Sequence, residues 1–325
     1  MTESIHPQPI GLVVIGRNEG ERLRVCLRSV LGAGRAVVYV DSGSTDGSVA
    51  LARSLGAVVV ALDMAVPFTA ARARNAGWRE LGRLAPGLQY VQFIDGDCEL
   101  NPGWLPTAQA FLDAHPGHAV VAGRLRERYP ERSVFNRLCD MEWDTPIGEA
   151  KACGGIALMR LAPLRAAGGF RDDLIAGEEP ELCVRLRAAG WKIYRLDAEM
   201  ALHDAAMLHW RQWWRRSVRG GFAFAQGSWL HGGPPEHHWV QETRRALAWG
   251  LVLPIAIVLA AGWLGAGVLW LLLLYPAQML RLMRRGGGAA RAFFLVAGKF
   301  AEATGIVQFA WSRLTHRRQH IIEYK

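Results

Sequence analysis

The sequence predicts an α/β protein with a mostly parallel sheet flanked by helices, followed by a membrane-associated carboxyl-terminal part. Short apolar runs alternate with helical patterns in the first two-thirds of the 325 residues. Of these residues 51% are hydrophobic and 21% charged, a balance that excludes disordered and fibrous chains. Residues 205–325 carry 15 basic and 4 acidic side chains, whereas residues 1–204 carry 23 and 25. A neutral soluble domain is therefore followed by a basic, apolar part.

Four apolar runs are typical of strands, the first of them of a buried strand, and helical patterns separate them. The runs cover residues 10–15, 36–40, 57–62 and 90–94, and the helices are expected over residues 19–31, 46–55 and 70–84. Strands joined by single helices of this length form right-handed βαβ units, which gives a mostly parallel sheet. In such open sheets ligands bind beyond the carboxyl ends of the strands.

Polar turns follow three of these predicted strands, at Gly16–Glu19, Asp41–Ser48 and Asp95–Cys98. Each turn alone has an ordinary explanation, because Asp, Ser and Gly favour turns and helix N-caps. Three such turns would converge on one edge of the sheet and indicate a ligand site there. No G-x-G-x-x-G follows the first strand and no G-x-x-x-x-G-K-[ST] occurs. Dinucleotide-binding and P-loop interpretations therefore lose their main support.

Five motifs occur here in the order that one known family shares. They are V-V-I-G-R-N-E, D-S-G-S-T-D-G-S, A-R-A-R-N-A-G, F-I-D-G-D and G-E-E-P-E-L-C-V-R-L, spread over roughly residues 10–205. The set resembles the family 2 glycosyltransferases with the GT-A fold. This resemblance implies inverting transfer of a sugar from a nucleotide-diphosphate donor, with residues 1–205 as the catalytic domain.

A divalent cation and a donor site follow from the resemblance. Paired carboxylates after a strand offer hard oxygen ligands where a cation bridges to phosphate. By resemblance Asp97 is a direct ligand of Mg²⁺ or Mn²⁺, and His203 completes that site. Turn carboxylates in solvent and a structural histidine are the ordinary alternatives. The residues that the resemblance assigns to donor or acceptor binding are Glu19, Asp41, Arg74, Asp95, Gly154 and Gly155.

A catalytic base is expected where residues 177–186 open a helix. Acidic residues at a helix N-terminus usually complement the helix dipole. The family places its base in this cluster, commonly as Glu-Asp, whereas this chain has Glu178-Glu179. The resemblance puts the general base at Glu179. Which of Glu178 and Glu179 points at the acceptor stays open.

Residues 206–245 are expected to hold an amphipathic helix and a linker. At helical spacing Trp210, Trp213 and Trp214 share one face, and the arginines at 211, 215 and 219 share another. Tryptophan opposite arginine is typical of a helix lying on an anionic membrane surface. Core packing of the tryptophan face against the catalytic domain is the alternative, and both arrangements can hold at once.

Residues 246–325 are expected to form the membrane anchor. Ala246–Leu280 is a run of 35 residues without charge, longer than the ~18 apolar residues that mark a membrane span. Central glycines and arginines at both ends favour a hairpin with both ends cytoplasmic. Phe293–Trp311 contains Lys299 and Glu302, which favours an interfacial or re-entrant helix over a third span. A basic tail with Arg313, Arg317 and Arg318 follows.

These observations together predict a metal-assisted glycosyltransferase of the cell inner membrane whose catalytic domain faces the cytoplasm. The expected acceptor is a lipid-linked or cell-envelope molecule. A processive polysaccharide synthase is the alternative enzyme, although one hairpin is too little membrane for a translocation channel unless the protein oligomerises. Gln212–Arg216 is similar to the Q-x-x-R-W signature of such synthases, but Arg216 stands in place of Trp, so processivity is not inferred from it. A catalytically silent scaffold that keeps the fold is the other alternative. Nucleic acid is not an expected partner, because the basic excess coincides with the apolar segments.

The cysteines and the amino terminus indicate the compartment. Five cysteines are scattered without a C-x-x-C pair, which argues against disulfide and zinc-ribbon frameworks and fits a reducing environment. No apolar stretch follows a basic one at the amino terminus, so no cleaved signal peptide is expected.

Overall fold

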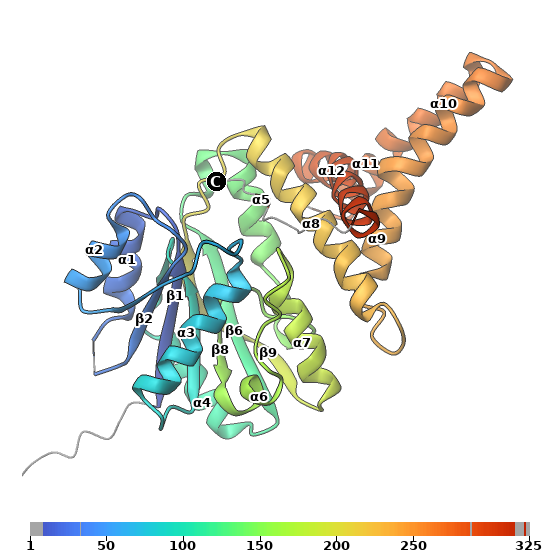
Figure 1. Ribbon diagram of the computed structural model, residues 1–325. Helices are drawn as coiled ribbons and strands as arrows, with labels where there is room; N and C mark the ends of the chain where they lie inside the picture. The colour runs from blue at the N-terminus through green and yellow to red at the C-terminus, as the bar shows by residue number, and fades with distance from the viewer. Residues whose placement is uncertain (1–8, 33, 287, 316–321, 323–325) are drawn as a thin grey trace, which may run out of the picture. The chain divides into compact units, whose positions relative to one another are not determined.

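The computed structural model describes residues 9–32, 34–286, 288–315 and 322, and Figure 1 shows its elements. The basic positions Arg317 and Arg318 of the expected tail lie outside the described residues. Contacts divide the chain into two units. The first unit comprises Met1–Arg132, Cys139–Leu174 and Glu178–Ala206, and the second comprises Ser133–Leu138, Ile175–Gly177 and Met207–Lys325.

One mixed sheet of nine strands forms the framework of the first unit. Its strand order is β3-β2-β1-β4-β8-β6-β9-β5, and β7 pairs with β9. The strands are β1 (Ile10–Gly16), β2 (Val37–Asp41), β3 (Val58–Ala61), β4 (Tyr90–Asp95), β5 (Cys98–Leu100), β6 (His118–Glu127), β7 (Gly148–Ala150), β8 (Ala157–Arg160) and β9 (Lys192–His203).

The four predicted strands are β1 to β4, and they make up the parallel half of the sheet. β1 pairs in parallel with β2 and β4, and β2 pairs in parallel with β3. Beyond β4 the sheet is mixed: β8 is antiparallel to β4 and β6, while β6 and β9 are parallel. Every strand pair is thus parallel in the half that the βαβ pattern described, whereas the other half combines parallel and antiparallel pairs. The α/β class with flanking helices is confirmed.

Helices of the first unit pack on this sheet through apolar faces. They are α1 (Glu21–Val30), α2 (Ser48–Ser54), α3 (Ala70–Leu84), α4 (Trp104–Ala114), α6 (Leu161–Ala166) and α7 (Glu178–Ala188). Thr69 caps α3, because its hydroxyl accepts a hydrogen bond from the Arg72 amide at 3.1 Å. Gly77 lets α3 approach β1 closely, since a Cβ at Gly77 would lie 2.3 Å from a methyl group of Val13. This close contact fixes α3, the helix that carries Arg74, against the sheet.

The regular elements of the second unit are helices, over the residues that the structure describes. They are the first part of α5 (Val134–Trp143), α8 (Trp210–His231), α9 (Val240–Leu247), the π-helical η2 (Ala248–Val252), α10 (Leu253–Leu264), the 3-10 segment η3 (Ala266–Leu273), α11 (Leu274–Arg284) and α12 (Gly288–Leu314).

α8 and α12 cross closely where glycines remove side chains. A Cβ at Gly305 would lie 1.9 Å from the Val218 carbonyl oxygen. Trp213 packs edge-on against Phe294 at 4.9 Å between ring centroids and is 7% exposed. Trp210 remains 43% exposed. The tryptophan face of α8 is therefore partly packed inside this unit and partly open.

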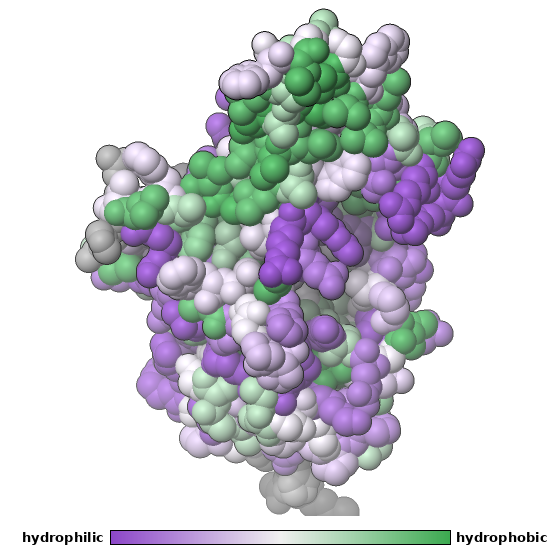
Figure 2. Space-filling model, turned by 90° about the vertical axis from the view of Figure 1, so that its right-hand side faces the viewer, coloured by the Kyte–Doolittle hydropathy of each residue, from purple (hydrophilic) through white to green (hydrophobic). Residues whose placement is uncertain are grey.

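Three helical runs of the described residues are long and apolar enough to cross a membrane. They are Val240–Leu264, Ala266–Arg284 and Gly288–Leu314. The first two meet at Gly265, whose φ of 91° breaks the helix. The third run, for which the sequence favoured an interfacial or re-entrant helix, carries the Lys299–Glu302 ion pair at 2.6 Å. Figure 2 shows a broad apolar area, coloured green, in the upper part of the face that it presents.

Candidate active site

Turns after β1, β2 and β4 come together at the carboxyl edge of the parallel half-sheet. The Gly96 amide donates to the Ile15 carbonyl at 2.8 Å, and the Ser42 amide donates to the Gly16 carbonyl at 3.1 Å. A Cβ at Gly96 would lie 3.2 Å from the Glu19 side chain. The glycine of the Asp-Gly-Asp turn therefore packs directly on Glu19. The polar turns that the sequence singled out form one site.

Asp41 organises the turn after β2. Its carboxylate accepts hydrogen bonds from the amides of Gly43 at 3.0 Å and Ser44 at 2.9 Å, and from the Tyr39 hydroxyl at 3.0 Å. Burial raises the pKa of Tyr39, so this phenol stays a proton donor to the carboxylate at neutral pH. Asp41 is thus buried and held in one orientation by its own loop.

Asp97 and His203 face each other because of strand register. β5 begins one residue after Asp97, and its Cys98 pairs with His203 at the end of β9. The Asp97 Oδ2 and His203 Nε2 atoms are 3.1 Å apart, and Trp143 stacks on the His203 ring at 4.7 Å between centroids. A carboxylate oxygen and an imidazole nitrogen are both ligand types for divalent cations, and at this separation they can bind one ion together. Residues that are 106 positions apart in sequence thus share one corner of the sheet.

Arg74 of α3 connects two acidic residues at the same edge. Its guanidinium donates to Asp95 Oδ1 at 3.0 Å and to Glu178 Oε1 at 2.5 Å. Burial disfavours the cation, but the two carboxylates outweigh this effect and raise the pKa of Arg74. A Cβ at Gly155 would lie 2.6 Å from the guanidinium, so only glycine fits beside it. Arg74 is therefore a fully charged, buried group fixed from three sides.

Glu179 has a different environment from its neighbour Glu178. Its carboxylate accepts hydrogen bonds from the amides of Cys153 at 2.7 Å and Gly154 at 2.9 Å. The thiols of Cys153 and Cys183 each donate to Oε1 at 2.9 Å. Burial raises the pKa of Glu179, although the hydrogen bonds act in the opposite direction. Glu178 thus binds Arg74, whereas Glu179 binds the backbone amides of the 153–154 loop.

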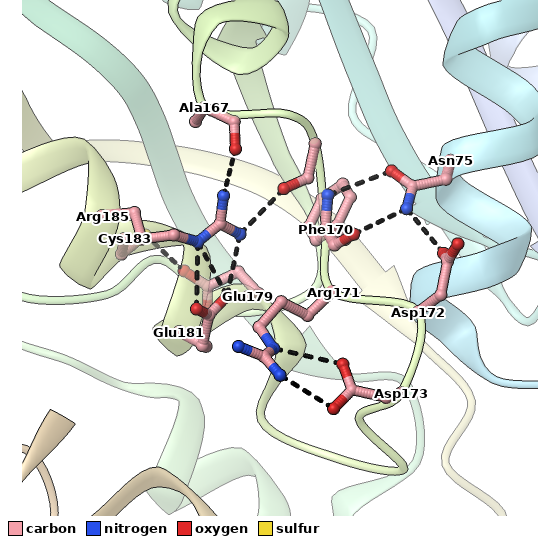
Figure 3. Close-up of polar contacts among 11 residues, drawn as sticks. Asn75, Ala167, Phe170, Arg171, Asp172, Asp173, Glu179, Glu181, Cys183 and Arg185 are labelled. Carbon is pink, nitrogen blue, oxygen red and sulfur yellow. Dashed lines mark hydrogen bonds and ion pairs between the residues drawn. The ribbon is translucent and has the colours of Figure 1, made fainter. Parts of the chain in front are cut away.

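A network of polar contacts fixes the loop that precedes α7 (Figure 3). Arg185 binds both carboxylate oxygens of Glu181, with Nη2 to Oε2 at 2.8 Å, and also donates to the Gly169 carbonyl at 2.8 Å. Asn75 of α3 exchanges two hydrogen bonds with the backbone of Phe170, at 2.7 and 3.0 Å. Helices α3 and α7 are thereby tied to one loop, so Arg74 and Glu178 keep their relative positions.

Sequence reasoning missed the partners of these site residues. Cys183 lies four residues after Glu179, a spacing that brings two side chains together on a helix and was a usable signal. Cys153 directly precedes the Gly154-Gly155 pair, but its contact with Glu179 depends on tertiary packing. The same holds for the stacking of Trp143 on His203.

Comparison with protein families and curated proteins identifies relatives by sequence. A family model described as "Glycosyl transferase family 2" matches residues 12–153. An uncharacterized glycosyltransferase of Mycobacterium bovis is 32% identical over 185 residues, which cover 55% of this chain and 79% of that protein. A pre-mycofactocin glycosyltransferase of Mycobacterium tuberculosis is 26% identical over 219 residues, 61% of this chain. The match spans only 45% of that longer relative.

Solved structures share the fold. A mannosyltransferase from Pyrobaculum calidifontis in complex with GDP-Man and Mn²⁺ superposes with a TM-score of 0.67 at 19% identity, over 95% of this chain and 88% of that one. S. aureus TarS in complex with UDP-GlcNAc superposes with a TM-score of 0.52 at 15% identity, over 95% and 93% of the two chains. The GT-A architecture expected from the motifs is confirmed.

Proposed function

The chain belongs to the family 2 glycosyltransferases, and from that premise we propose that it is a membrane-bound, inverting enzyme that acts on a lipid-linked or cell-envelope acceptor. Its donor is a nucleoside-diphosphate sugar. The observation that carries this proposal is the charge arrangement at one sheet edge, where the Asp97–His203 pair and the buried Arg74 belong to the same unit. An acidic cation site and a fixed guanidinium together suit a diphosphate group.

Asp97 and His203 are the proposed holders of Mg²⁺ or Mn²⁺. The 3.1 Å separation of their ligand atoms and the burial of Asp97 support this assignment. When bound, the cation would neutralise charge on the leaving diphosphate. The Pyrobaculum calidifontis mannosyltransferase was solved with Mn²⁺, which supports a divalent cation for this chain as well.

Glu19, Asp41 and the Arg74–Asp95 pair are the proposed donor contacts. Asp41 is pre-oriented by its loop, so binding a nucleobase or ribose would cost little side-chain ordering. Arg74 would orient the diphosphate or the sugar through the charge that Asp95 and Glu178 now balance. The Gly154–Gly155 loop, which packs on Arg74, is proposed to border the transferred sugar.

Glu179 is the proposed general base, and Glu178 the residue that positions Arg74. The raised pKa of Glu179 supports this choice, because a base with a pKa nearer the working pH accepts a proton more effectively. Its hydrogen bonds to the 153–154 amides hold the carboxylate at the loop where an acceptor would meet the sugar. Glu178 is engaged by the guanidinium at 2.5 Å, which supports the positioning role.

The second unit is proposed to anchor the enzyme in the inner membrane with the first unit in the cytoplasm. Its apolar helical runs support the anchor, and the arginines that flank residues 246–280 support the orientation. An enzyme held at this surface would meet acceptors that are themselves carried by lipid.

A screen of nucleotide sugars tests this function. The full-length protein in detergent or nanodiscs is incubated with UDP- and GDP-linked sugars, with Mn²⁺, with Mg²⁺ or with excess chelator. We expect at least one donor to be hydrolysed or transferred only when a divalent cation is present. No turnover and no binding with any donor would overturn the proposal.

A further inference from the structure

A second cluster of metal-ligand atoms surrounds Glu179. The sulfur atoms of Cys153 and Cys183 each lie 2.9 Å from Glu179 Oε1, and the three ligand atoms lie within 4.8 Å of one another. We propose that these residues form an inhibitory site for a soft divalent cation such as Zn²⁺. Binding at this site stands independently of the proposed function, but the inhibition rests on it, because the cation would capture the carboxylate assigned as general base.

The ligand set and its size fit Zn²⁺. Two thiolates and one carboxylate leave the fourth tetrahedral position open for water. Zinc–sulfur bonds of about 2.3 Å and zinc–oxygen bonds of about 2.0–2.2 Å place tetrahedral ligand atoms about 3.5–3.8 Å apart. The two sulfurs therefore need to move less than about 1 Å from Glu179 Oε1 to admit the ion. A hard cation such as Mg²⁺ prefers oxygen ligands and would not compete here.

Solvent reaches this cluster from the loop side. Cys153 is partly exposed and Gly154 is exposed, with a φ of 82° that glycine adopts without strain. Glu179 and Cys183 lie beneath them, both buried, on the first two turns of α7. Their i, i+4 spacing presents two ligands on one helix face, and the Cys153 loop supplies the third. A cation entering from the loop would thus tie α7 to the glycine loop beside Arg74.

Both thiols carry their protons in the metal-free protein. Burial raises the pKa of Cys153 well above its usual range. For Cys183 the hydrogen bond with Cys153 lowers the pKa, but burial and the nearby Glu179 outweigh it and raise the pKa to about 11. Metal binding breaks two S–H bonds, forms two metal–thiolate bonds and releases two protons to solvent, without any oxidant. The occupancy of the site therefore rises with pH, and binding is reversible by chelators.

Cobalt spectroscopy tests this site directly in the full-length protein. Co²⁺ is titrated in the presence of saturating Mg²⁺, which is intended to fill the Asp97–His203 site. We expect one equivalent to produce a thiolate-to-cobalt charge-transfer band that Zn²⁺ abolishes. The band should disappear in Cys153→Ser and in Cys183→Ser. Cys98→Ser is the matched control, because Cys98 is the thiol beside Asp97 and His203, and this variant should keep the band.

Alkylation of the wild-type protein tests the same site even if the cysteine variants fold poorly, and inhibition tests its effect on activity. In the wild-type protein Zn²⁺ should protect Cys153, the partly exposed thiol of the cluster, from a thiol reagent, as read by mass spectrometry. If a donor is turned over, Zn²⁺ should reduce the rate in wild type at least tenfold more than in Cys153→Ser. Absence of a charge-transfer band in wild type would overturn the site. A band that Cys98→Ser removes would assign the cobalt to the other cluster, which equally contradicts it. Zn²⁺ binding without inhibition of transfer would refute Glu179 as the base but would still support the metal site.

Discussion

The two units of this protein differ in the kind of side chain that they bury and the kind that they expose. The first unit buries charged groups such as Arg74 and Glu179, each 3% exposed. The second unit exposes large apolar side chains, including Trp263 at 93%, Leu264 at 77% and Trp270 at 74%. An unpaired buried charge costs several kcal/mol, and exposed apolar surface costs about 25 cal/mol per Å². Buried charge is therefore concentrated in the first unit, and exposed apolar surface in the second.

The largest expected effect comes from the first unit, when the carboxylate proposed to hold the cation is removed. Asp97→Ala deletes the carboxylate that faces His203 at 3.1 Å. Loss of a cation that stabilises the leaving diphosphate removes several kcal/mol of transition-state stabilisation, so transfer should fall by at least about a hundredfold. Initial rates with the donor found by screening measure the effect. Asp113→Ala, an exposed carboxylate on α4, is the control and should keep its rate. Full activity of Asp97→Ala would contradict the metal assignment.

Substituting the two adjacent glutamates should separate their roles. Glu179→Gln keeps the size of the side chain but cannot accept a proton, so kcat should fall on the order of 10² to 10⁴. Donor affinity should survive, because the donor contacts lie on other loops. Glu178→Gln removes the charge that balances Arg74 and should mainly weaken donor binding. A dead Glu178→Gln beside an active Glu179→Gln would reverse the two assignments.

A charge placed on the apolar surface should affect only the second unit. Leu259 of α10 is 66% exposed, and replacing leucine by arginine within a spanning helix costs about 3 kcal/mol of insertion free energy. Leu259→Arg should therefore lower the fraction of protein that stays in membranes after an alkaline wash. Leu84→Arg, at an exposed apolar position of the first unit, is the matched control. Equal membrane retention of both variants would mean that α10 does not lie in the bilayer.

The smallest expected effect is the change of the reaction rate with pH. Burial raises the pKa of Glu179 above its ordinary value of 4.5, and only the deprotonated carboxylate acts as a base. Activity should therefore decline as the pH falls through that raised pKa, so the acidic limb of the kcat/KM profile lies above pH 4.5. A rate that stays constant down to pH 4.5 would contradict the proposed base.

Much of the first unit could be predicted because its signals are local. Strands β1, β2 and β4 are buried apolar runs, and the polar turns directly follow them. The edge strand β3 is apolar in sequence but largely open to solvent. The mixed half of the sheet could not be predicted in this way, because β8 and β9 pair with strands that are far away in the sequence and no local pattern gives their direction or register. The same limit applies to the site: the contact of Cys153 with Glu179 joins residues 26 positions apart through a loop whose path the sequence does not reveal.

The second unit was predictable as apolar but not in its packing. An uncharged run is visible in sequence, and its break at Gly265 falls among the glycines noted there. The close crossing of α8 and α12 depends on single glycines such as Gly305, whose role emerges only when a carbonyl lies 1.9 Å from a missing Cβ. Helical periodicity placed Trp213 and Trp210 on one face, but it could not tell that Trp213 is buried while Trp210 stays 43% exposed.

Calorimetric titration of UDP and GDP into the full-length protein tests the central claim most directly, namely that the first unit holds a metal-dependent nucleotide site. Titrations are made with Mn²⁺ and with excess chelator, on wild type and on Asp97→Asn. We predict that at least one of the two nucleotides binds wild type only with Mn²⁺, and that Asp97→Asn loses this binding while its melting temperature stays unchanged. Equal binding in the presence of chelator, or in Asp97→Asn, would contradict the account.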